Sequence, residues 1–417
     1  MKVLWITNIL FPEATGILCG NKEFKSSGGW MLGLADAIVS TGKVELIVAS
    51  VSPFVNNLTK LIGKNITYYV LPLGEGNTKE NQGYRHFWKQ IYSEVEPEIV
   101  HLHGTECSHG LAYMYERGID NVVVSIQGLL SSCAEYYCAG LSIYDIYLNL
   151  TPRDFLKGSI LADQRRFKQR SIYESKILKA AKYFIGRTSW DKAKSITINS
   201  FAKYFSCNEI LRNEFYCDDF WKYENCSLYS IFISQAGYPL KGFHQVLKAM
   251  PIILSKYPYA TIRVAGPDIT KCESFNDLIH FTGYGRYLKR LINKLGLDQK
   301  VTFLGQLSAL EMKQEYLNCN VFVCPSSIEN SPNSLGEAQI LGVPCVASYV
   351  GGIPDMMAGN EENLYRFDDI EMLAYKVIRV FNDRDRQTDM RNVAIKRHDR
   401  ISNAQELLSI YNKIKIV

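Results

Sequence analysis

The stretch SLYSIFIS, residues 227–234, decides the predicted fold because it restarts a pattern that the first half of the chain already contains. Further short apolar runs follow it, and amphipathic segments separate them; the runs lie at 260–266, 300–305, 320–325 and 343–348. Such runs are typical of strands in a parallel sheet that helices cover on both faces. The second half of the chain therefore predicts a doubly wound α/β domain.

The first half of the chain has the same alternation. Its apolar runs lie at 2–7, 44–50, 66–73, 98–103 and 121–126, and the segments 29–41 and 83–96 are expected to be helical. A single core stops growing at roughly 250–300 residues, so a chain of 417 residues favours two domains. We expect two Rossmann-like domains that face each other across a cleft and are joined near residues 215–226. The expected ranges are 1–220, 221–395 and, for a last helix that crosses back to the first domain, 396–417.

Composition excludes some classes of protein. Hydrophobic residues make up 47% of the chain and charged residues 21%, which is ordinary for a globular protein. The net charge of +5 is too small to indicate a nucleic-acid partner. No run of about 18 apolar residues predicts a membrane span. The 11 cysteines include no C-x-x-C pair, which favours reduced, buried thiols in a cytoplasmic protein.

The segment 157–182 is expected to be a helix with an unusual charge. It carries eight basic residues against two acidic ones. Two interpretations remain open: a solvated helix face, or a contact with an anionic membrane surface or acidic ligand.

The segment SSIENSPNSLGEAQILGVPC, residues 326–345, contains a helix start suited to an anion. Ser331 is a good N-cap residue and Pro332 fits the first helical position. The free backbone donors would then be those of Asn333, Ser334 and Leu335. Ligands of doubly wound folds bind outside the carboxyl ends of the strands, where this helix is expected to begin.

Two carboxylates surround this helix start, Glu329 before it and Glu337 inside it. They would repel a bare phosphate but suit a ligand whose anionic centre has hydroxyl groups on both sides, because carboxylates accept hydrogen bonds from sugar hydroxyls. A sugar–diphosphate–nucleoside has this layout. An ordinary exposed helix start is the alternative.

Three further residues are weaker candidates for a phosphate site. Lys241 could neutralise phosphate as a point charge. Gly28 and Gly29 lie between the first strand and a helix, where they would allow the backbone to approach a ligand. The G-x-G-x-x-G fingerprint is absent, and a plain turn explains both glycines equally well.

The residues from Glu329 to Asp355 resemble the E-x7-E region of retaining, nucleotide-sugar-dependent glycosyltransferases of the GT-B fold, the glycogen-synthase-like and mannosyltransferase-like group. Other segments resemble this family in the right order, among them FPEATG with SSGGWMLGLADAI, YPLKGFHQVLKAM and VTFLGQLS. The segment GRTSWDKA, residues 186–193, is similar to a variant in bacterial surface-polysaccharide members. The resemblance covers nearly the whole chain and implies an N-terminal acceptor domain and a C-terminal donor domain.

The resemblance also implies roles for the residues of the helix start. Glu329 would contact the hydroxyls of the donor sugar and Glu337 those of the ribose. The amides near Asn333, Ser334 and Leu335 would hold the diphosphate, with Lys241 beside it. Gly28 and Gly29 would lie opposite, at the phosphate and acceptor edge.

Two positions depart from the family pattern. The family usually has an Arg about five residues before the Lys, where this chain has Gln235 and Ala236. The family also often has a His after the strand at 121–126, where this chain has Gln127. Gln cannot act as a base at neutral pH, although it can hydrogen-bond a sugar hydroxyl. His109 and His103 are weaker candidates for the acceptor side.

The resemblance implies a retaining, metal-independent hexosyltransferase. It would move a hexose from a UDP- or GDP-sugar to a glycan or lipid-linked acceptor, in bacterial polysaccharide biosynthesis. No cofactor, metal or nucleic acid is expected besides the donor, and the protein would be cytoplasmic, with a peripheral contact to the inner membrane face. The alternatives are a nucleotide-sugar epimerase, a glycosidase that uses Glu329 and Glu337, and a non-catalytic binding protein.

Overall fold

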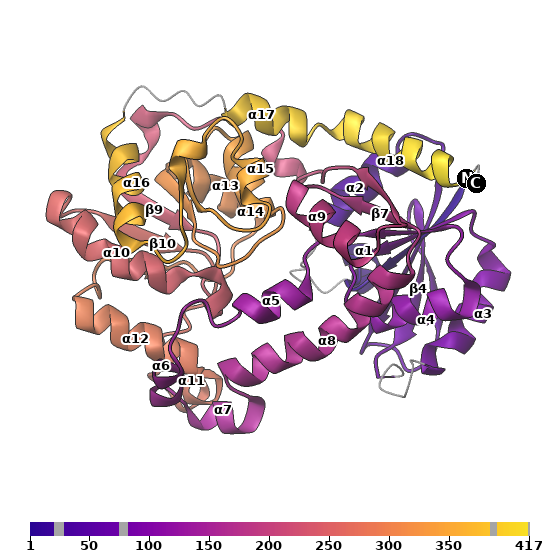
Figure 1. Cartoon of the computed structure of the whole chain (residues 1–417), viewed down its shortest axis with the longest axis horizontal. Coiled ribbons are helices and arrows are strands. Elements are labelled where there is room, and N and C mark those ends of the chain that lie inside the picture. The colour runs from indigo at the N-terminus through magenta and orange to yellow at the C-terminus, as the bar shows by residue number, and fades with distance from the viewer. Residues whose placement is uncertain (21–28, 75–81, 384–389, 416–417) are drawn as a thin grey trace. The chain divides into compact units, whose positions relative to one another are not determined.

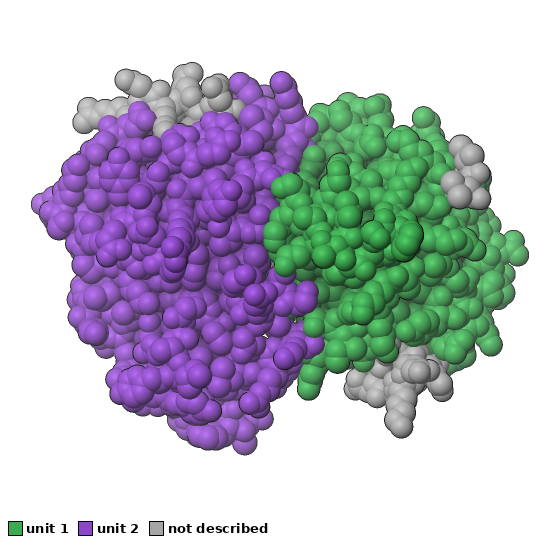
Figure 2. Space-filling model, viewed as in Figure 1, with its two compact units in different colours: residues 1–130, 169–212, 398–417 green, residues 131–168, 213–397 purple. Residues whose placement is uncertain are grey.

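The computed structural model describes residues 1–20, 29–74, 82–383 and 390–415. Contacts between Cα atoms divide the chain into two compact units, which Figures 1 and 2 show. The first unit comprises residues 1–130, 169–212 and 398–417, and the second comprises 131–168 and 213–397. This division differs from the expected ranges 1–220, 221–395 and 396–417 mainly at residues 131–168. That segment comes from the first half of the sequence but packs with the second unit.

The first unit is built on a sheet that has eight strands within the described residues, in the order β3-β4-β2-β1-β5-β6-β7-β8. Figure 1 labels β4 and β7 of this sheet. The strands are β1 Lys2–Thr7, β2 Glu45–Ser52, β3 Thr59–Ile62, β4 Ile66–Pro72, β5 Ile99–His103, β6 Val122–Ser125, β7 Tyr183–Gly186 and β8 Lys203–Ser206. All neighbours are parallel except the edge strand β3, which pairs antiparallel with β4. The apolar runs predict five of these strands. The pattern misses β3, β7 and β8, which are four residues long each.

Helices pack on this sheet, and the last helix of the chain is one of them. The helices are α1 Pro12–Cys19, α2 Gly29–Val39, α3 Gln82–Val95, α4 Ser108–Arg117, α9 Ser189–Ile198 and α18 Arg400–Lys415. α18 packs against α2 and β5. Its Tyr411 hydroxyl accepts a hydrogen bond from Trp5 Nε1 at 2.9 Å and bonds Nδ1 of His101 at 2.7 Å. The C-terminal segment therefore completes the core of the first unit.

The second unit contains a fully parallel sheet, with the order β11-β10-β9-β12-β13-β14 in the described residues. Its strands are β9 Ser227–Ile233, β10 Thr261–Val264, β11 Val301–Phe303, β12 Cys319–Cys324, β13 Cys345–Ser348 and β14 Leu364–Tyr365. From β9 the chain builds the sheet first toward β11 and then, starting with β12, toward β14. The strand order therefore reverses between β9 and β12, and this is the point where open α/β sheets bind ligands.

The helices of the second unit alternate with its strands. They are α10 Phe243–Lys256, α11 Phe275–His280, α12 Gly283–Leu295, α13 Ala309–Asn318, α14 Asn333–Ile340, α15 Ile353–Met356, α16 Ile370–Asn382 and α17 Met390–Arg397. Polar caps explain several starts: Ser308 and Glu311 form a capping box for α13, and the Thr282 hydroxyl accepts from the Gly285 amide at α12. None of the helices in the described ranges is long and apolar enough to cross a bilayer.

Residues 131–168 add four helical pieces to the second unit. They are α5 Leu130–Tyr136, α6 Ile143–Leu148, α7 Pro152–Lys157 and the first half of α8 Ile160–Ala180. The helix expected at 157–182 is therefore shorter, because Gly158 adopts φ 100° and separates α7 from α8. Side chains of the second unit hold this segment: His244 Nε2 contacts the Ala139 carbonyl at 2.9 Å.

The 11 cysteines form no disulfide bonds, and five of them are buried. Five histidines are also buried, and among them His101, His109 and His244 form hydrogen bonds inside the units. Burial lowers the pKa of His101 to about 3 and that of His244 to about 3. Burial lowers the pKa of His109 to about 4, although its bond to the Thr7 carbonyl opposes the shift. These rings are neutral in the folded protein at pH 6.

We predict that the protein loses stability as the pH falls below 6.5. Each of these histidines takes up a proton in the unfolded chain near its ordinary pKa of about 6.5, but only near pH 3 to 4 in the folded protein. Each should therefore lower the free energy of unfolding by about 1.4 kcal/mol per pH unit between those values. Urea unfolding at a series of pH values measures the slope.

His244→Gln should reduce that slope by one proton, whatever it does to stability at neutral pH. The same substitution at the exposed His86 controls for the chemical change itself. An unchanged slope in His244→Gln would contradict the prediction.

Candidate active site

Two loops meet at the carboxyl edge of the second sheet, at its switch point. The loop after β9 ends in the turn Pro239–Lys241, and the loop after β12 carries Glu329. The Lys241 ammonium Nζ lies 2.5 Å from Glu329 Oε1. Their side chains are 19% and 16% exposed, so the pair is largely buried but accessible from one side. Eighty-eight positions of sequence separate two groups that the sheet brings into contact.

Two hydrogen bonds hold Glu329, one at its backbone carbonyl and one at its carboxylate. The Gly352 amide donates to the Glu329 carbonyl at 3.0 Å, and the Ser326 hydroxyl donates to Glu329 Oε1 at 2.9 Å. Gly351 has φ 51°, and a Cβ at this position would lie 1.9 Å from the Glu329 carbonyl oxygen. Only glycine allows so close an approach of two backbones. The two glycines at 351 and 352 thus fix the backbone of Glu329, the residue that carries the carboxylate.

The turn that carries Lys241 is fixed in the same way. Gly242 has φ 70°, and a Cβ there would lie 1.7 Å from the Pro325 carbonyl oxygen. The Ser327 amide donates to the Leu240 carbonyl at 2.8 Å. The loops after β9 and β12 are therefore in direct backbone contact on either side of the ion pair.

Lys241 stays charged in this surrounding. Burial alone would lower the pKa of Lys241, but the Glu329 carboxylate and the nearby Tyr238 outweigh burial and raise it above its ordinary value. The ammonium also lies 5.8 Å from the centre of the Tyr238 ring, a cation–π contact. A fixed positive charge at the switch point can neutralise a phosphate group.

Helix α14 begins next to this pair, with a start that differs from the expectation. Pro332 occupies the N-cap position, no side chain caps the helix, and Asn333 is the first helical residue. Ser331 is therefore not the cap. The Leu335 amide donates to the Pro332 carbonyl at 3.0 Å, so it is not one of the free donors either. The first two amides, of Asn333 and Ser334, are those whose partners lie outside the helix by α-helical geometry.

Glu337 lies one turn further along α14 and is 4% exposed. Glu337 also has an interaction within the protein. Buried carboxylates are normally held by such interactions. The two carboxylates therefore differ: Glu329 is partly open to solvent, whereas Glu337 is enclosed.

Of the remaining predicted residues, only Gln235 lies in one of these loops. Gln235 is exposed, two residues after β9, and the partly exposed Gln127 follows β6 in the first unit. His103 and His109 are 1% and 6% exposed in the core of the first unit, which gives them a structural environment rather than a surface for an acceptor. Two glycines complete the set: Gly29 is the first residue of α2, and Gly28 lies outside the described residues.

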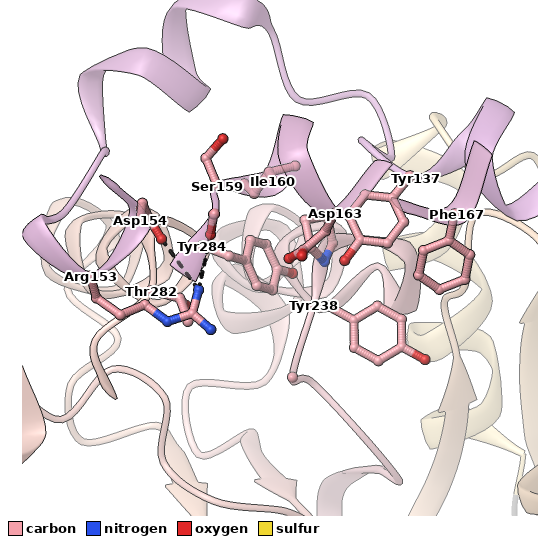
Figure 3. Close-up of a pocket in the computed structure, with 14 residues that line it drawn as sticks. Tyr137, Arg153, Asp154, Ser159, Ile160, Asp163, Phe167, Tyr238, Thr282 and Tyr284 are labelled. Carbon is pink, nitrogen blue, oxygen red and sulfur yellow. Dashed lines mark hydrogen bonds and ion pairs between the residues drawn. The ribbon is translucent and has the colours of Figure 1, made fainter. Parts of the chain in front are cut away.

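The sequence does not predict a cavity of about 420 Å³ that lies beside Tyr238 in the second unit. Figure 3 shows aromatic rings of Tyr137, Phe167 and Tyr238 on one side and polar groups of Arg153 and Ser159 on the other. The Tyr137 ring lies 5.1 Å from Phe167 and is stacked with Tyr238 at 6.3 Å. The aromatic residues of segment 131–168 are the sequence feature that could have indicated this cavity. The cavity itself forms only because that segment packs against residues 237–239 and 282–284.

Solved structures with this architecture are GT-B glycosyltransferases, and the two parallel-sheet Rossmann-like domains define the same fold here. Sucrose-phosphate synthase from Thermosynechococcus elongatus superposes with a TM-score of 0.71 at 15% identity, over 99% of both chains. WaaG, a glycosyltransferase involved in lipopolysaccharide biosynthesis, gives 0.58 at 13% identity over 99% of this chain and 98% of its own. The E. coli trehalose-6-phosphate structure bound with UDP-2-fluoro glucose gives 0.62 at 13% identity over 100% and 99%.

Sequence comparison points to the same class for the second unit. The family model described as Glycosyl transferases group 1 matches residues 227–397. Sulfoquinovosyl transferase SQD2 of Arabidopsis thaliana is 34% identical over 111 residues, 26% of this chain and 22% of its own. D-inositol 3-phosphate glycosyltransferase of Corynebacterium urealyticum is 28% identical over 182 residues, 42% of this chain and 41% of its own. The chain thus spans less than half the length of these curated relatives.

We predict that Gly242→Ala destabilises the second unit far more than Gly296→Ala. Both glycines have left-handed backbones, with φ 70° and 65°, but a Cβ at Gly296 meets nothing within 4 Å. Gly296→Ala should cost about 1–2 kcal/mol from backbone strain alone. Gly242→Ala adds the clash with the Pro325 carbonyl and should cost at least about 2 kcal/mol more.

Urea unfolding of the two variants, followed by tryptophan fluorescence, measures the difference. Equal losses of stability would show that the contact between the two loops is not tight.

Proposed function

We propose that this protein is a retaining, metal-independent hexosyltransferase that uses a UDP- or GDP-sugar as donor. The acceptor is a glycan or a lipid-linked glycan, and the reaction belongs to bacterial polysaccharide biosynthesis. The observation that carries the proposal is the Lys241–Glu329 pair, held at the switch point beside the start of α14. The comparisons support the transfer of sugars in general, and one structural neighbour was solved with UDP-2-fluoro glucose.

The site meets the negative charge of a donor diphosphate with fixed groups. The Lys241 ammonium supplies a full charge, and the first amides of α14 supply donors at the positive end of a helix dipole. These groups would stabilise the diphosphate as it leaves, which is the step where negative charge develops. Since Gln235 stands where the family usually has an Arg, Lys241 carries the larger share of this task.

The two carboxylates would bind opposite ends of the donor, one the sugar and the other the nucleoside. Glu329 lies at the open side of the pair and would accept hydrogen bonds from hydroxyls of the transferred hexose. Glu337 lies deeper on α14 and would bind the ribose hydroxyls. A donor phosphate that approaches Lys241 weakens its bond to Glu329, so the carboxylate becomes available to the sugar as the donor binds.

The chemical step needs no protein base in this scheme. The acceptor oxygen bonds to the anomeric carbon on the face from which the diphosphate leaves, the bond between that carbon and the phosphate oxygen breaks, and the acceptor proton passes to the leaving phosphate. Gln127, which cannot accept that proton, would only hydrogen-bond a sugar hydroxyl. Positioning and stabilisation of the leaving group then account for catalysis.

We predict that Glu329→Gln and Glu337→Gln differ in their effect on nucleotide affinity. Glu329→Gln frees Lys241 from its partner, so the affinity for UDP or GDP should stay the same or rise up to about tenfold, while turnover of the full donor falls. Glu337→Gln should weaken the nucleotide by about tenfold, because it removes a charged acceptor for the ribose. Lys241→Met should lose both binding and turnover. Calorimetric titration with UDP and GDP, beside steady-state rates, measures these effects.

Glu371→Gln, on the exposed surface of α16, is the matched control and should behave as the wild type. Equal loss of nucleotide binding in Glu329→Gln and Glu337→Gln would refute the division of roles. Full turnover in both variants, or hydrolysis of aryl glycosides without nucleotide, would refute the proposed function.

We also predict that turnover survives chelation. Lys241 and the α14 amides meet the charge of the diphosphate, so EDTA should leave the rate of donor consumption within about twofold of the untreated enzyme, a change below about 0.4 kcal/mol in the barrier. Direct chromatography of the nucleotide product avoids coupling enzymes that need metal. Loss of turnover with EDTA, and its recovery with Mg²⁺ or Mn²⁺, would contradict metal independence.

A further inference from the structure

Two short helices of the second unit, α6 and α7, expose large apolar side chains to solvent. On α6, Ile143, Tyr144 and Tyr147 are between 60% and 72% exposed, and on α7 Phe155 and Leu156 are 79% and 86% exposed. Scattered apolar residues on a surface are normal, but a group of this size marks a docking surface. We refer to these five side chains as the apolar face.

The chain holds the apolar face firmly in place. The Thr151 hydroxyl, between α6 and α7, donates to the Phe281 carbonyl at 2.7 Å, and Arg286 Nη1 donates to the Leu150 carbonyl at 2.9 Å. α6 packs against α12 and α7 against α11 (Figure 1). α11 adds the partly exposed Leu278 and Ile279 beside α7. The exposed side chains therefore belong to an ordered part of the second unit.

Basic groups surround the apolar face. Lys157 ends α7 and is exposed, and Arg166 Nη2 donates to its carbonyl at 2.5 Å. Arg286 and Arg290 are exposed on α12, at the other side of the α6–α7 connection. Acidic residues also lie near the face. Asp154 is buried, and Asp163 is paired with Arg166 at 2.6 Å. Asp145 of α6 accepts from the Ser142 hydroxyl at 2.6 Å, and Asp277 of α11 accepts from the Ser274 amide at 3.0 Å. Lys157, Arg286 and Arg290 thus present exposed positive charge beside the apolar face.

We propose that the apolar face docks the protein on an anionic lipid bilayer. Aromatic and aliphatic side chains with a basic rim match the boundary between acyl chains and anionic headgroups, where tyrosine places its ring in the apolar layer and its hydroxyl in water. This surface is distinct from the basic helix α8 as a whole, since it combines apolar with basic groups. It goes beyond the proposed transfer reaction, because it names a partner surface outside the donor site.

The same segment links the apolar face to the candidate active site. The Ser327 hydroxyl, in the loop that carries Glu329, donates to the Tyr136 carbonyl at 2.9 Å. Arg153, near the start of α7, and Ser159, just after its end, line the cavity beside Tyr238 (Figure 3). Docking through α6 and α7 would therefore place this cavity near the headgroup region, where the polar end of a lipid-linked acceptor would lie.

Co-sedimentation of the full chain with vesicles tests the proposal. We expect binding to vesicles of phosphatidylcholine mixed with phosphatidylglycerol and weaker binding to pure phosphatidylcholine, with a difference that salt reduces. Phe155→Ser/Leu156→Ser should lower binding to the mixed vesicles at least tenfold. Both side chains are exposed and outside the cavity lining, so the variant should keep the melting temperature and UDP affinity of the wild type.

Two control variants separate this surface from its alternatives. Tyr259→Ser removes an aromatic ring that is 82% exposed elsewhere in the second unit and should bind vesicles as the wild type does. Lys176→Gln/Lys179→Gln reduces the charge of α8 far from α7 and should have a small effect. If the lysine variant loses binding while Phe155→Ser/Leu156→Ser retains it, α8 is the contact and the proposal is wrong.

Absence of vesicle binding by the wild-type protein would also overturn the proposal. So would a dimer in sedimentation velocity that Phe155→Ser/Leu156→Ser abolishes without any vesicle binding, because a second copy would then cover the face. None of these outcomes depends on turnover, so they are independent of the tests of the transfer reaction.

Discussion

The contact between the loops after β9 and β12 is the constraint on which the candidate site depends. Gly242, in the loop after β9, has a left-handed backbone that lies against the Pro325 carbonyl of the loop after β12. Gly351, after β13, lies against the Glu329 carbonyl of that same loop in the same way. A Cβ atom at either position would clash with the carbonyl oxygen. The result is a largely buried ion pair between Lys241 and Glu329. Since the desolvation of both charges opposes such a pair, the surrounding hydrogen bonds are needed to hold it.

The segment 131–168 gives the second unit its features beyond a bare doubly wound sheet. It contributes α5, α6, α7 and part of α8, one wall of the cavity beside Tyr238, and the apolar face. Its carbonyls at Tyr136 and Ala139 accept bonds from the loop of Glu329 and from α10. Residues 131–168 thus surround part of the candidate site, although the charged residues of that site all come from the C-terminal half of the chain.

Much of the fold could be predicted because strand and helix periodicity is a local property. The strands β1, β2, β4, β5 and β6, and five strands of the second unit, are continuous apolar runs, which only a sheet covered on both faces requires. The pattern missed the edge strands β3 and β8, which carry exposed lysines and are not continuously apolar, as well as the two-residue strand β14 and the four-residue strand β7. The start of α14 was misplaced by one residue, because Pro332 serves as N-cap with no side-chain bond to mark it.

The sequence by itself determined the class of fold, the position of Glu329, Glu337 and Lys241 at strand ends and on a helix, and the kind of charge around them. The tertiary structure alone decided that Lys241 pairs with Glu329, that Glu337 is enclosed, and that residues 131–168 join the second unit. The physical reason is that periodicity depends on neighbours within a few residues, whereas pairing and burial depend on which distant segments the sheet order brings together.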